Sequence, residues 1–288
     1  MISNYGKSVR ARLLNLAKKE HMEFMKVLVR YLHERLLYRV STSKYNSQFL
    51  LKGSSLLYAY DQFKARPTID IDLLGNKISG NQDDLKNVFA EICSIACEED
   101  GVSFDVSTMQ LAPIAVEKKY PGTCITITVY LDTIVQPISI DIGFGDVVTP
   151  APLLLDYPLL LPDVPPVELY AYSLESLIAE KFHAMVDRDG GNSRMKDYFD
   201  VYYLFKNHKI DSESLQEAIA DTFRNRGMKY HEHLQLFTDE FAADSTRIKR
   251  WNAFLEKIGI KEQLPFSEVM NTLRDNLMPY WSRELLSE

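Results

Sequence analysis

Cysteine is scarce in this sequence, and three cysteines in 288 residues are too few for a disulfide framework. We interpret Cys93, Cys97 and Cys124 as buried free thiols rather than metal ligands. No apolar run is long enough to cross a bilayer, so we predict no transmembrane helix. The N-terminus lacks the apolar core of a signal peptide, and the chain has neither an internal repeat nor a low-complexity tract. These absences predict a cytoplasmic protein that does not insert into membranes.

The sequence also has no excess of basic over acidic residues. The chain has 33 Lys and Arg against 40 Asp and Glu, a formal net charge of −7. This balance argues against tight, non-specific nucleic-acid binding by the whole surface, but it is compatible with a polynucleotide substrate. Hydrophobic residues make up 46% and charged residues 25%, as in ordinary globular proteins, and the length suffices for one large or two modest domains.

The N-terminal segment 9–40 is predicted to be helical, because apolar residues such as Phe24, Val27 and Leu28 recur at helical spacing. Its polar side carries basic residues: Arg10, Arg12, Lys18, Lys19, Lys26, Arg30, Arg35 and Arg39. We interpret this side as a solvated helix face. The alternative is a docking surface for RNA phosphates.

The chain up to residue 150 alternates predicted strands and helices. A short strand at 49–51 turns at Lys52 into a helix, and an aspartate-bearing strand follows it. A further helix is predicted at 84–99, and further strands at 102–109, 124–131 and 138–142. This mixture predicts an α/β (α+β) core.

Prolines crowd residues 150–166, which excludes a regular helix or a central strand there, and the leucines between them predict packing along a surface. Beyond Ser173, a predicted N-cap, the pattern is helical. The further helices expected there span 195–205, 212–223, 246–258 and 266–277. We therefore predict N-terminal helices with an α/β core over 1–150, a Pro/Leu-rich connector over 151–172 and a helical C-terminal domain over 173–288.

Asp70 and Asp72 are the most informative pair. In an extended segment residues i and i+2 point to the same side, so both carboxylates face one spot while Ile69, Ile71 and Leu73 line the other side. Like charges held this close repel strongly unless a cation lies between them or one is protonated. Oxygen ligands favour Mg²⁺ or Mn²⁺ over zinc, and Mg²⁺ is commonly held by carboxylates together with substrate phosphates. We therefore predict a nucleotide site here.

Two further motifs support this site. The turn Lys52-Gly53-Ser54-Ser55 opens a helix whose N-terminal N–H groups can cradle phosphate. Asp141 alternates with Ile140 and Ile142, so it faces the side opposite to them. If its strand pairs beside the Asp70 strand, Asp141 completes a three-carboxylate cluster suited to two-metal phosphoryl transfer, as a third ligand or a base. The alternative is a strand-end aspartate that feeds the turn 143–146.

The helical half holds a second group of polar residues. Lys181 can contact a triphosphate as a point charge, and Asp197 and Asp200 share one helix face. The alternatives are an interhelical ion-pair network and an ordinary flexible loop at 187–192. The network would consist of Glu180, Lys181, Arg194, Lys196 and Asp197. The remaining candidates, His231 and His233, could share a strand face but have no third ligand placed to make a zinc site.

These motifs, in this order, resemble the AbiEii/AbiGii toxin family. The likeness runs from about residue 9 to 223 and is carried by Lys52-Gly53-Ser54, Arg66-Pro67-Thr68-Ile69-Asp70-Ile71-Asp72, the segment from Asp141 to Asp146, Ala179-Glu180-Lys181 and the segment from Arg194 to Asp200. Members are nucleotidyltransferase-like toxins of type IV toxin–antitoxin and abortive-infection pairs, with MenT toxins as relatives.

The resemblance implies a DNA-polymerase-β-like nucleotidyltransferase core with a mostly helical C-terminal region. It also implies roles for single residues: Gly53 and Ser54 contact the triphosphate, Asp70 and Asp72 hold Mg²⁺, Lys181 is the family's essential lysine, and Asp197 or Asp200 is its later aspartate. Asp141 matches an Asp-Ile-Gly pattern of the family. Relatives transfer nucleotides to RNA, tRNA acceptor ends among them, and a cognate antitoxin is expected.

We therefore predict a Mg²⁺-dependent (or Mn²⁺-dependent) nucleotidyltransferase toxin that moves a nucleoside monophosphate from an NTP to RNA, a tRNA 3′ end first among the candidates. Two alternatives are carried forward. The acceptor is a protein or a small molecule, which the acidic charge favours, or the protein is a non-catalytic nucleotide-binding regulator or partner-binding module.

Overall fold

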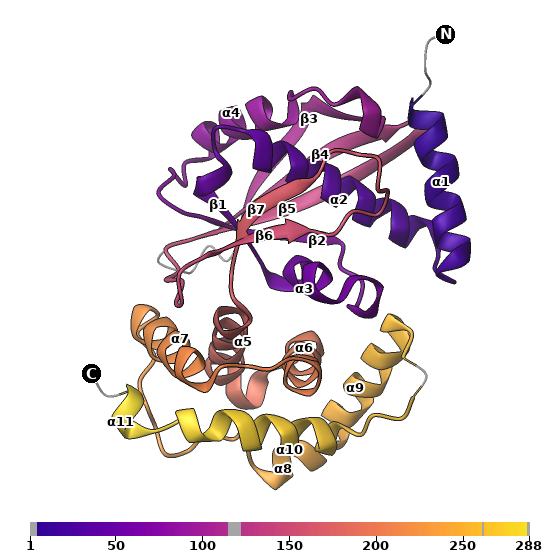
Figure 1. The fold of residues 1–288 in the computed structure, drawn as a ribbon. Helices are drawn as coiled ribbons and strands as arrows, with labels where there is room; N and C mark the ends of the chain where they lie inside the picture. The colour runs from indigo at the N-terminus through magenta and orange to yellow at the C-terminus, as the bar shows by residue number, and fades with distance from the viewer. Residues whose placement is uncertain (1–4, 115–121, 261, 287–288) are drawn as a thin grey trace. The chain divides into compact units, whose positions relative to one another are not determined.

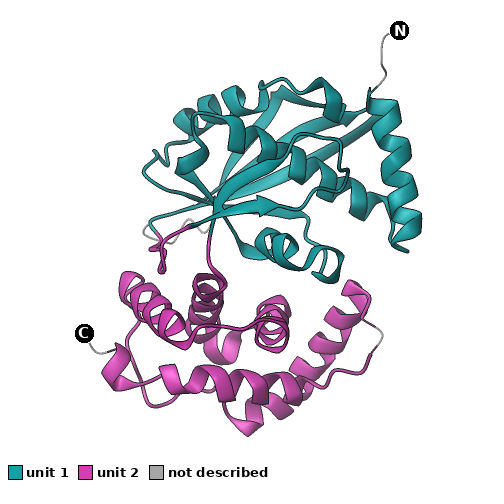
Figure 2. Cartoon of the chain, in the orientation of Figure 1, with its two compact units in different colours: residues 1–145, 153–171 teal, residues 146–152, 172–288 magenta. Residues whose placement is uncertain are grey.

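The computed structural model describes residues 5–114, 122–260 and 262–286, and the chain divides into two compact units (Figure 1, Figure 2). Unit 1 comprises Met1–Gly145 and Leu153–Ala171, and unit 2 comprises Asp146–Pro152 and Tyr172–Glu288. Residues 1–4, part of the stretch considered for a signal peptide, lie outside the described residues. Within the described ranges, no helix combines the length and the apolar character needed to span a bilayer.

Unit 1 is built on a seven-stranded sheet with the strand order β3-β4-β5-β2-β1-β7-β6. The strands are β1 (Phe49–Lys52), β2 (Asp70–Gly75), β3 (Val102–Ile114), β4 (Gly122–Leu131), β5 (Ile134–Phe144), β6 (Leu153–Tyr157) and β7 (Val167–Ala171). The helices are α1 (Tyr5–Lys19), α2 (Phe24–Thr42), α3 (Gly53–Asp61) and α4 (Gln82–Cys93), with short 3₁₀ turns η1 (Asn46–Gln48), η2 (Gln62–Lys64) and η3 (Glu98–Asp100). The predicted α/β core is confirmed, and the segment expected as a connector supplies β6 and β7.

The sheet separates an apolar face from a polar one. Along β4, buried and half-buried residues alternate strictly, as a strand with one covered face requires. Ile71, Ile125 and Ile140 of three neighbouring strands are completely buried. Helix α2 packs against β5 and β7, and α4 packs against β3. Each such buried side chain contributes roughly 1.5–3 kcal/mol, so this apolar layer holds the strands in place.

Helix α2 overturns the interpretation of the N-terminal basic residues as one solvated face. The helical segment breaks after α1, and three of these residues on α2 are buried: Arg30, Arg35 and Arg39. Arg39 donates to the Asp100 carboxylate at 2.7 Å, and Arg35 donates to the Pro165 carbonyl at 3.0 Å. A buried charge is costly unless it is paired and hydrogen-bonded. These arginines therefore hold α2 inside unit 1 and are not presented to phosphates.

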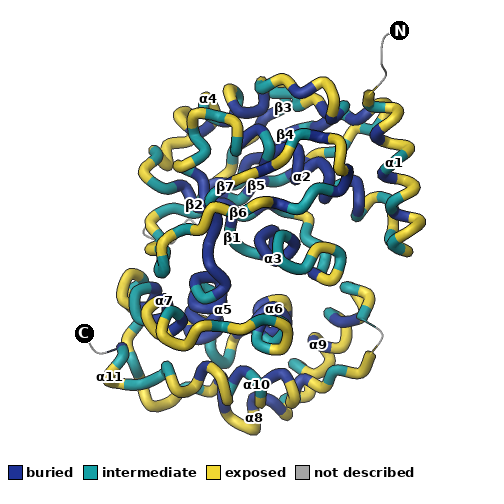
Figure 3. The backbone as a smooth tube through the Cα atoms, in the orientation of Figure 1, coloured by how far each residue is buried: buried dark blue, intermediate teal, exposed yellow. Residues whose placement is uncertain are grey.

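Unit 2 is helical, as predicted. Its helices are α5 (Leu174–Arg188), α6 (Met195–Asn207), α7 (Ser212–Asn225), α8 (Asp239–Ala243), α9 (Ser245–Ile258), α10 (Phe266–Leu277) and α11 (Arg283–Leu286), with η4 (Asp189–Gly191) and η5 (Met278–Tyr280). The Ser173 hydroxyl caps α5 by accepting the Ser176 N–H at 3.0 Å, as expected from the sequence. Helix α5, largely buried in Figure 3, packs against α6 and α7 and forms the centre of this unit.

Two irregular segments of unit 2, residues 146–152 and the loop around Asp189, are held by hydrogen bonds. The Ser176 hydroxyl donates to the Thr149 carbonyl at 2.7 Å, and Thr149 itself donates to Asp221 at 2.6 Å, which explains why Asp146–Pro152 belongs to this unit. Asp189, expected in a flexible loop, accepts the Leu236 N–H at 2.8 Å. Both segments therefore have defined hydrogen-bond partners.

Candidate active site

Neighbouring strands of unit 1 place polar residues in one row. Strand β2 runs parallel to β5 with Asp72 paired to Asp141, β1 brings Lys52 opposite Asp72, and β4 brings Cys124 opposite Asp141. Directly paired residues point to the same face of a sheet. Asp70, two residues before Asp72 on β2, shares this face as well. The strand pairing on which the three-carboxylate cluster depends is therefore present.

Hydrophobic alternation determines this register. Asp72 and Asp141 are half-buried, whereas Ile71 and Ile140, which precede them on their strands, are completely buried. A slip of one residue would carry the carboxylates into the core and the isoleucines out of it. Ile69 differs from the prediction: it precedes β2 and is 75% exposed, so the alternating pattern begins only at Asp70.

The turn predicted to bind phosphate, Lys52-Gly53-Ser54-Ser55, packs directly against Asp72. Gly53 begins α3 with φ +62°, and a Cβ atom on it would lie 2.1 Å from Asp72 Oδ2. The Ser54 N–H donates to the same oxygen at 3.3 Å, and the Ser55 hydroxyl donates to the Asp70 carbonyl at 2.9 Å. The side chain of Arg66 donates to the Ser54 hydroxyl. The turn and the aspartate strand thus form one hydrogen-bonded unit, and the positive end of the α3 dipole lies beside a carboxylate.

Cys124 was not foreseen as part of this surface. Cys93 and Cys97 are buried free thiols as expected, but Cys124 is only half-buried, and Cys97 lies beyond the end of α4. Burial, together with a hydrogen bond to Asp141 and the charge of that carboxylate, raises the pKa of Cys124 to about 11. The thiol is therefore protonated at neutral pH and is a weak nucleophile. Cys124 lies opposite Asp141 because β4 and β5 form a hairpin, and the register of this hairpin, not the residues next to Cys124, sets the contact.

The donor set of this face fits a hard divalent cation. Asp70, Asp72 and Asp141 offer carboxylate oxygens, and Mg²⁺ is usually held by one or two carboxylates together with substrate phosphates rather than by a complete protein cage. In the described part of the chain, no three His, Cys, Asp or Glu side chains are arranged as a ready metal-binding group. His231 and His233 are exposed and lie outside any strand, so the expected shared strand face is wrong.

The second predicted group lies within unit 2 and is a buried ion-pair network. Lys181 Nζ, on α5, is 3.0 Å from Asp197 Oδ1 and 2.8 Å from Asp200 Oδ2, both on α6. Arg194 Nε is 2.8 Å from the other Asp197 oxygen. Burial alone would raise the pKa of Asp197, but the charges of Lys181 and Arg194 outweigh it and lower this pKa. The interhelical ion pairs considered as an alternative are therefore present, with Asp200 as a further member.

Glu180 belongs to a different network, centred on Arg226, which the sequence did not suggest. Arg226 Nη2 lies 2.8 Å from Asp146 and 3.0 Å from Glu180, and Nη1 lies 3.4 Å from His183 Nδ1. Burial would lower the pKa of Arg226, but the two carboxylates outweigh it and raise this pKa. Arg226 is 80 residues from Asp146 and 46 from Glu180, so no local spacing could have indicated the contact.

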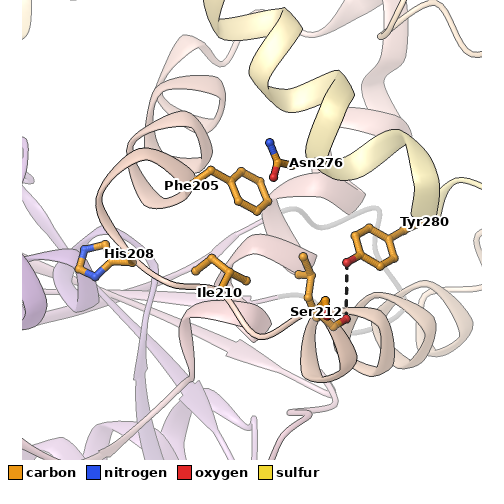
Figure 4. A pocket seen from close by; sticks show the side chains of 7 residues that line it. Phe205, His208, Ile210, Ser212, Asn276 and Tyr280 are labelled. Atoms are coloured by element: carbon orange, nitrogen blue, oxygen red, sulfur yellow. Dashed lines mark hydrogen bonds between the residues drawn. The ribbon is translucent and has the colours of Figure 1, made fainter.

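Unit 2 also has a surface hollow of about 190 Å³ (Figure 4). It is lined by Phe205, His208, Ile210, Ser212, Leu215, Asn276 and Tyr280. The hydroxyl of Tyr280 donates to the Ser212 carbonyl at 3.5 Å across its rim. The residues predicted for the active site are not among those lining it.

Comparisons with known proteins agree with this architecture. The protein JHP933 from Helicobacter pylori has a similar fold at 15% identity, with a TM-score of 0.53 over 90% of this chain and 93% of that protein. A candidate nucleotidyltransferase from H. pylori gives 13% identity and a TM-score of 0.53 over 92% of this chain and 98% of that one. No curated protein matches the sequence significantly.

The family comparison carries the functional conclusion. The sequence family described as "Nucleotidyl transferase AbiEii toxin, Type IV TA system" matches residues 35–272, which include all the predicted site residues. The resemblance inferred from the motifs and the enzyme class are thereby confirmed. The chain belongs to the AbiEii family of nucleotidyl transferase toxins of type IV toxin–antitoxin systems.

Proposed function

We propose that this nucleotidyltransferase transfers a nucleoside monophosphate from an NTP to a hydroxyl of RNA, with a tRNA 3′ end as the acceptor. The observation that carries the chemistry is the pairing of Asp72 with Asp141 beside the Gly53-Ser54 turn. Phosphoryl transfer requires mainly positioning and charge neutralisation, and this face supplies carboxylates next to a helix N-terminus. The RNA acceptor follows from the family resemblance.

Asp70, Asp72 and Asp141 would hold Mg²⁺, or Mn²⁺, which supplies charge neutralisation of the phosphates when bound. Asp141 would alternatively accept the proton of the attacking hydroxyl, a role that is supported by its position on the same side of the sheet as Asp72. We assign metal binding to Asp70 and Asp72, since both lie on the same face of the short strand β2. Asp141 is assigned the role of third ligand or base.

Lys52, Gly53 and Ser54 would bind the triphosphate. Gly53 lets the backbone approach closely, the first N–H groups of α3 are donors for an anion, and Lys52 adds a positive charge on the strand next to Asp72. These groups recognise phosphates without reading the base, so they bind any NTP.

Lys181, the counterpart of the family's essential lysine, is also assigned to the triphosphate. Asp197 and Asp200 would then be positioning residues, because their carboxylates lie 3.0 and 2.8 Å from Lys181 Nζ and hold the ammonium in one orientation. Both aspartates contribute in this proposal, so the choice between them that the motif left open becomes a shared role.

A cognate antitoxin partner is part of the proposal, since members of the family act in toxin–antitoxin pairs. Modification of a tRNA 3′ end would block aminoacylation and arrest growth, which the antitoxin would prevent. The net charge of −7 favours a second candidate, a protein or small-molecule acceptor, because such acceptors need no basic surface.

The test is incubation of the purified protein with Mg²⁺, total RNA and each α-labelled NTP in turn. Asp70→Ala serves as the inactive variant, and Asp156→Ala, an exposed aspartate of β6, as the matched control. A labelled band of tRNA size, retained in Asp156→Ala and lost in Asp70→Ala, is expected. Label in protein or small molecules would replace the RNA acceptor by the second candidate, and NTP binding without transfer to any acceptor would favour a non-catalytic regulator.

A further inference from the structure

Arg66 lies directly against the proposed phosphate-binding turn. Its guanidinium donates to the hydroxyl oxygen of Ser54, and Nη1 also donates to the Pro67 carbonyl at 3.4 Å. Ser54 in turn is buried, at 5% exposure, and its N–H is bonded to Asp72. A continuous chain of hydrogen bonds therefore links Arg66, Ser54 and a carboxylate of the proposed metal site.

We propose that Arg66 is a positioning residue for the NTP, which orients the Ser54 hydroxyl toward the triphosphate and adds positive charge beside it. This inference rests on the proposed function of the same site.

The direction of the Ser54 hydroxyl follows from the donor inventory. Arginine has only N–H donors, so the Ser54 oxygen must be the acceptor in this bond. A hydroxyl carries a single proton, and with one lone pair occupied by Arg66 its O–H points away from the guanidinium. Because phosphate oxygens can only accept, an O–H directed into the turn is the form of Ser54 that binds them.

The charge of Arg66 acts in the same sense. The polar face of the sheet carries Asp70, Asp72 and Asp141, and an NTP brings further negative charge to it. Arg66 keeps its charge at every physiological pH, and its planar fork matches phosphate geometry. Arg66 lies between η2 and β2, in the segment that leads into the strand carrying Asp70 and Asp72, and its hydrogen bond to Ser54 holds its charge at the turn.

The test measures binding and needs no acceptor. Isothermal titration with Mg²⁺ compares the Kd of an NTP, and of inorganic tripolyphosphate, for wild type, Arg66→Gln, Arg66→Lys, Ser54→Ala and the double variant Ser54→Ala/Arg66→Gln. The control is Arg10→Gln, a half-exposed arginine paired with Asp132 at 3.0 Å in the same unit. Thermal melting of each variant establishes that it is folded.

Loss of one charge-assisted hydrogen bond should weaken both ligands about tenfold in Arg66→Gln, and less in Arg66→Lys, while Arg10→Gln binds like wild type. Because Arg66 acts partly through Ser54, its effect should shrink in the Ser54→Ala background. A Kd unchanged in Arg66→Gln, or an equal effect with and without Ser54, would overturn the inference. Wild type that binds NTP but labels no RNA would refute only the RNA acceptor, and wild type that binds no NTP would overturn both proposals.

Discussion

Replacement of Gly53 by alanine is the sharpest perturbation of the proposed site. The added Cβ would lie 2.1, 2.5 and 2.7 Å from Oδ2, Cγ and Cβ of Asp72. Contacts this short require a shift, and rotation of the carboxylate alone cannot relieve them because the Asp72 Cβ is itself too close. Asp72 is held in β2 between β1 and β5, so its carboxylate or the whole turn must move.

The cost has two separable parts. The left-handed conformation, φ +62° at Gly53, costs a non-glycine residue about 1–2 kcal/mol. Gly227 has nearly the same angle, φ +67°, but nothing within 4 Å of its would-be Cβ, so Gly227→Ala measures the conformational part alone. The remaining part is displacement of Asp72, and a shift of about 1 Å in a catalytic group costs roughly 100-fold in rate.

We therefore expect both variants to lose about 1–2 kcal/mol of unfolding free energy in urea, with a further loss in Gly53→Ala only. The rate of label transfer from NTP should fall about 100-fold in Gly53→Ala and remain near wild type in Gly227→Ala. A Gly53→Ala variant that transfers label as fast as Gly227→Ala would refute the placement of Asp72 in the reaction.

Two further predictions concern buried charges. Burial raises the pKa of Glu34 from 4.5 to about 7 and lowers that of His33 from 6.5 to about 4. The folded state thus gains a proton at Glu34 and loses one at His33 between pH 4.5 and 6.5, so the two effects on stability oppose each other. The Glu34→Gln variant keeps only the effect of His33, so its unfolding free energy should rise with pH across this window by up to roughly 3 kcal/mol. The measurement is the urea midpoint at several pH values. A midpoint that changes with pH in the variant as it does in wild type would contradict this prediction. The Lys181→Met variant should lose about 3–5 kcal/mol of unfolding free energy, because Asp197 and Asp200 stay buried without the charge of Lys181. The double variant Lys181→Met/Asp200→Asn should recover part of this loss, because it removes one of the two buried carboxylate charges. Equal urea midpoints for the two variants would disprove the network's contribution.

Local sequence patterns accounted for much of the fold. Alternation of apolar and polar residues located β2, β4 and β5, and the Ser173 N-cap located the start of α5. The ordered motifs from Lys52 to Asp200 identified the family, as the match over residues 35–272 confirms. Each of these patterns spans only a few residues of the chain, and over that distance the backbone period decides which side chains share a face.

Long-range contacts could not be obtained in this way. The arginines of α2 looked like a solvated face because helical spacing records which residues are polar, not which partners they meet. Arg39 is buried because Asp100 lies beside it, and Arg226 is fixed by Asp146 and Glu180 from distant segments. The cost of burying a charge depends on such partners, so burial of these side chains follows from tertiary structure.

The candidate site divides along the same line. The amino-acid sequence by itself determined that Asp70 and Asp72 share a face and that a Gly-Ser turn precedes them. It also determined that Asp141 points to the face opposite to that of its neighbours Ile140 and Ile142. Only the tertiary structure decided that β5 pairs with β2, that Gly53 closes on Asp72 and that Lys181 lies between two aspartates. The reason is physical: strand periodicity is a property of neighbouring residues, whereas pairing and charge compensation depend on which distant segments the apolar core brings together.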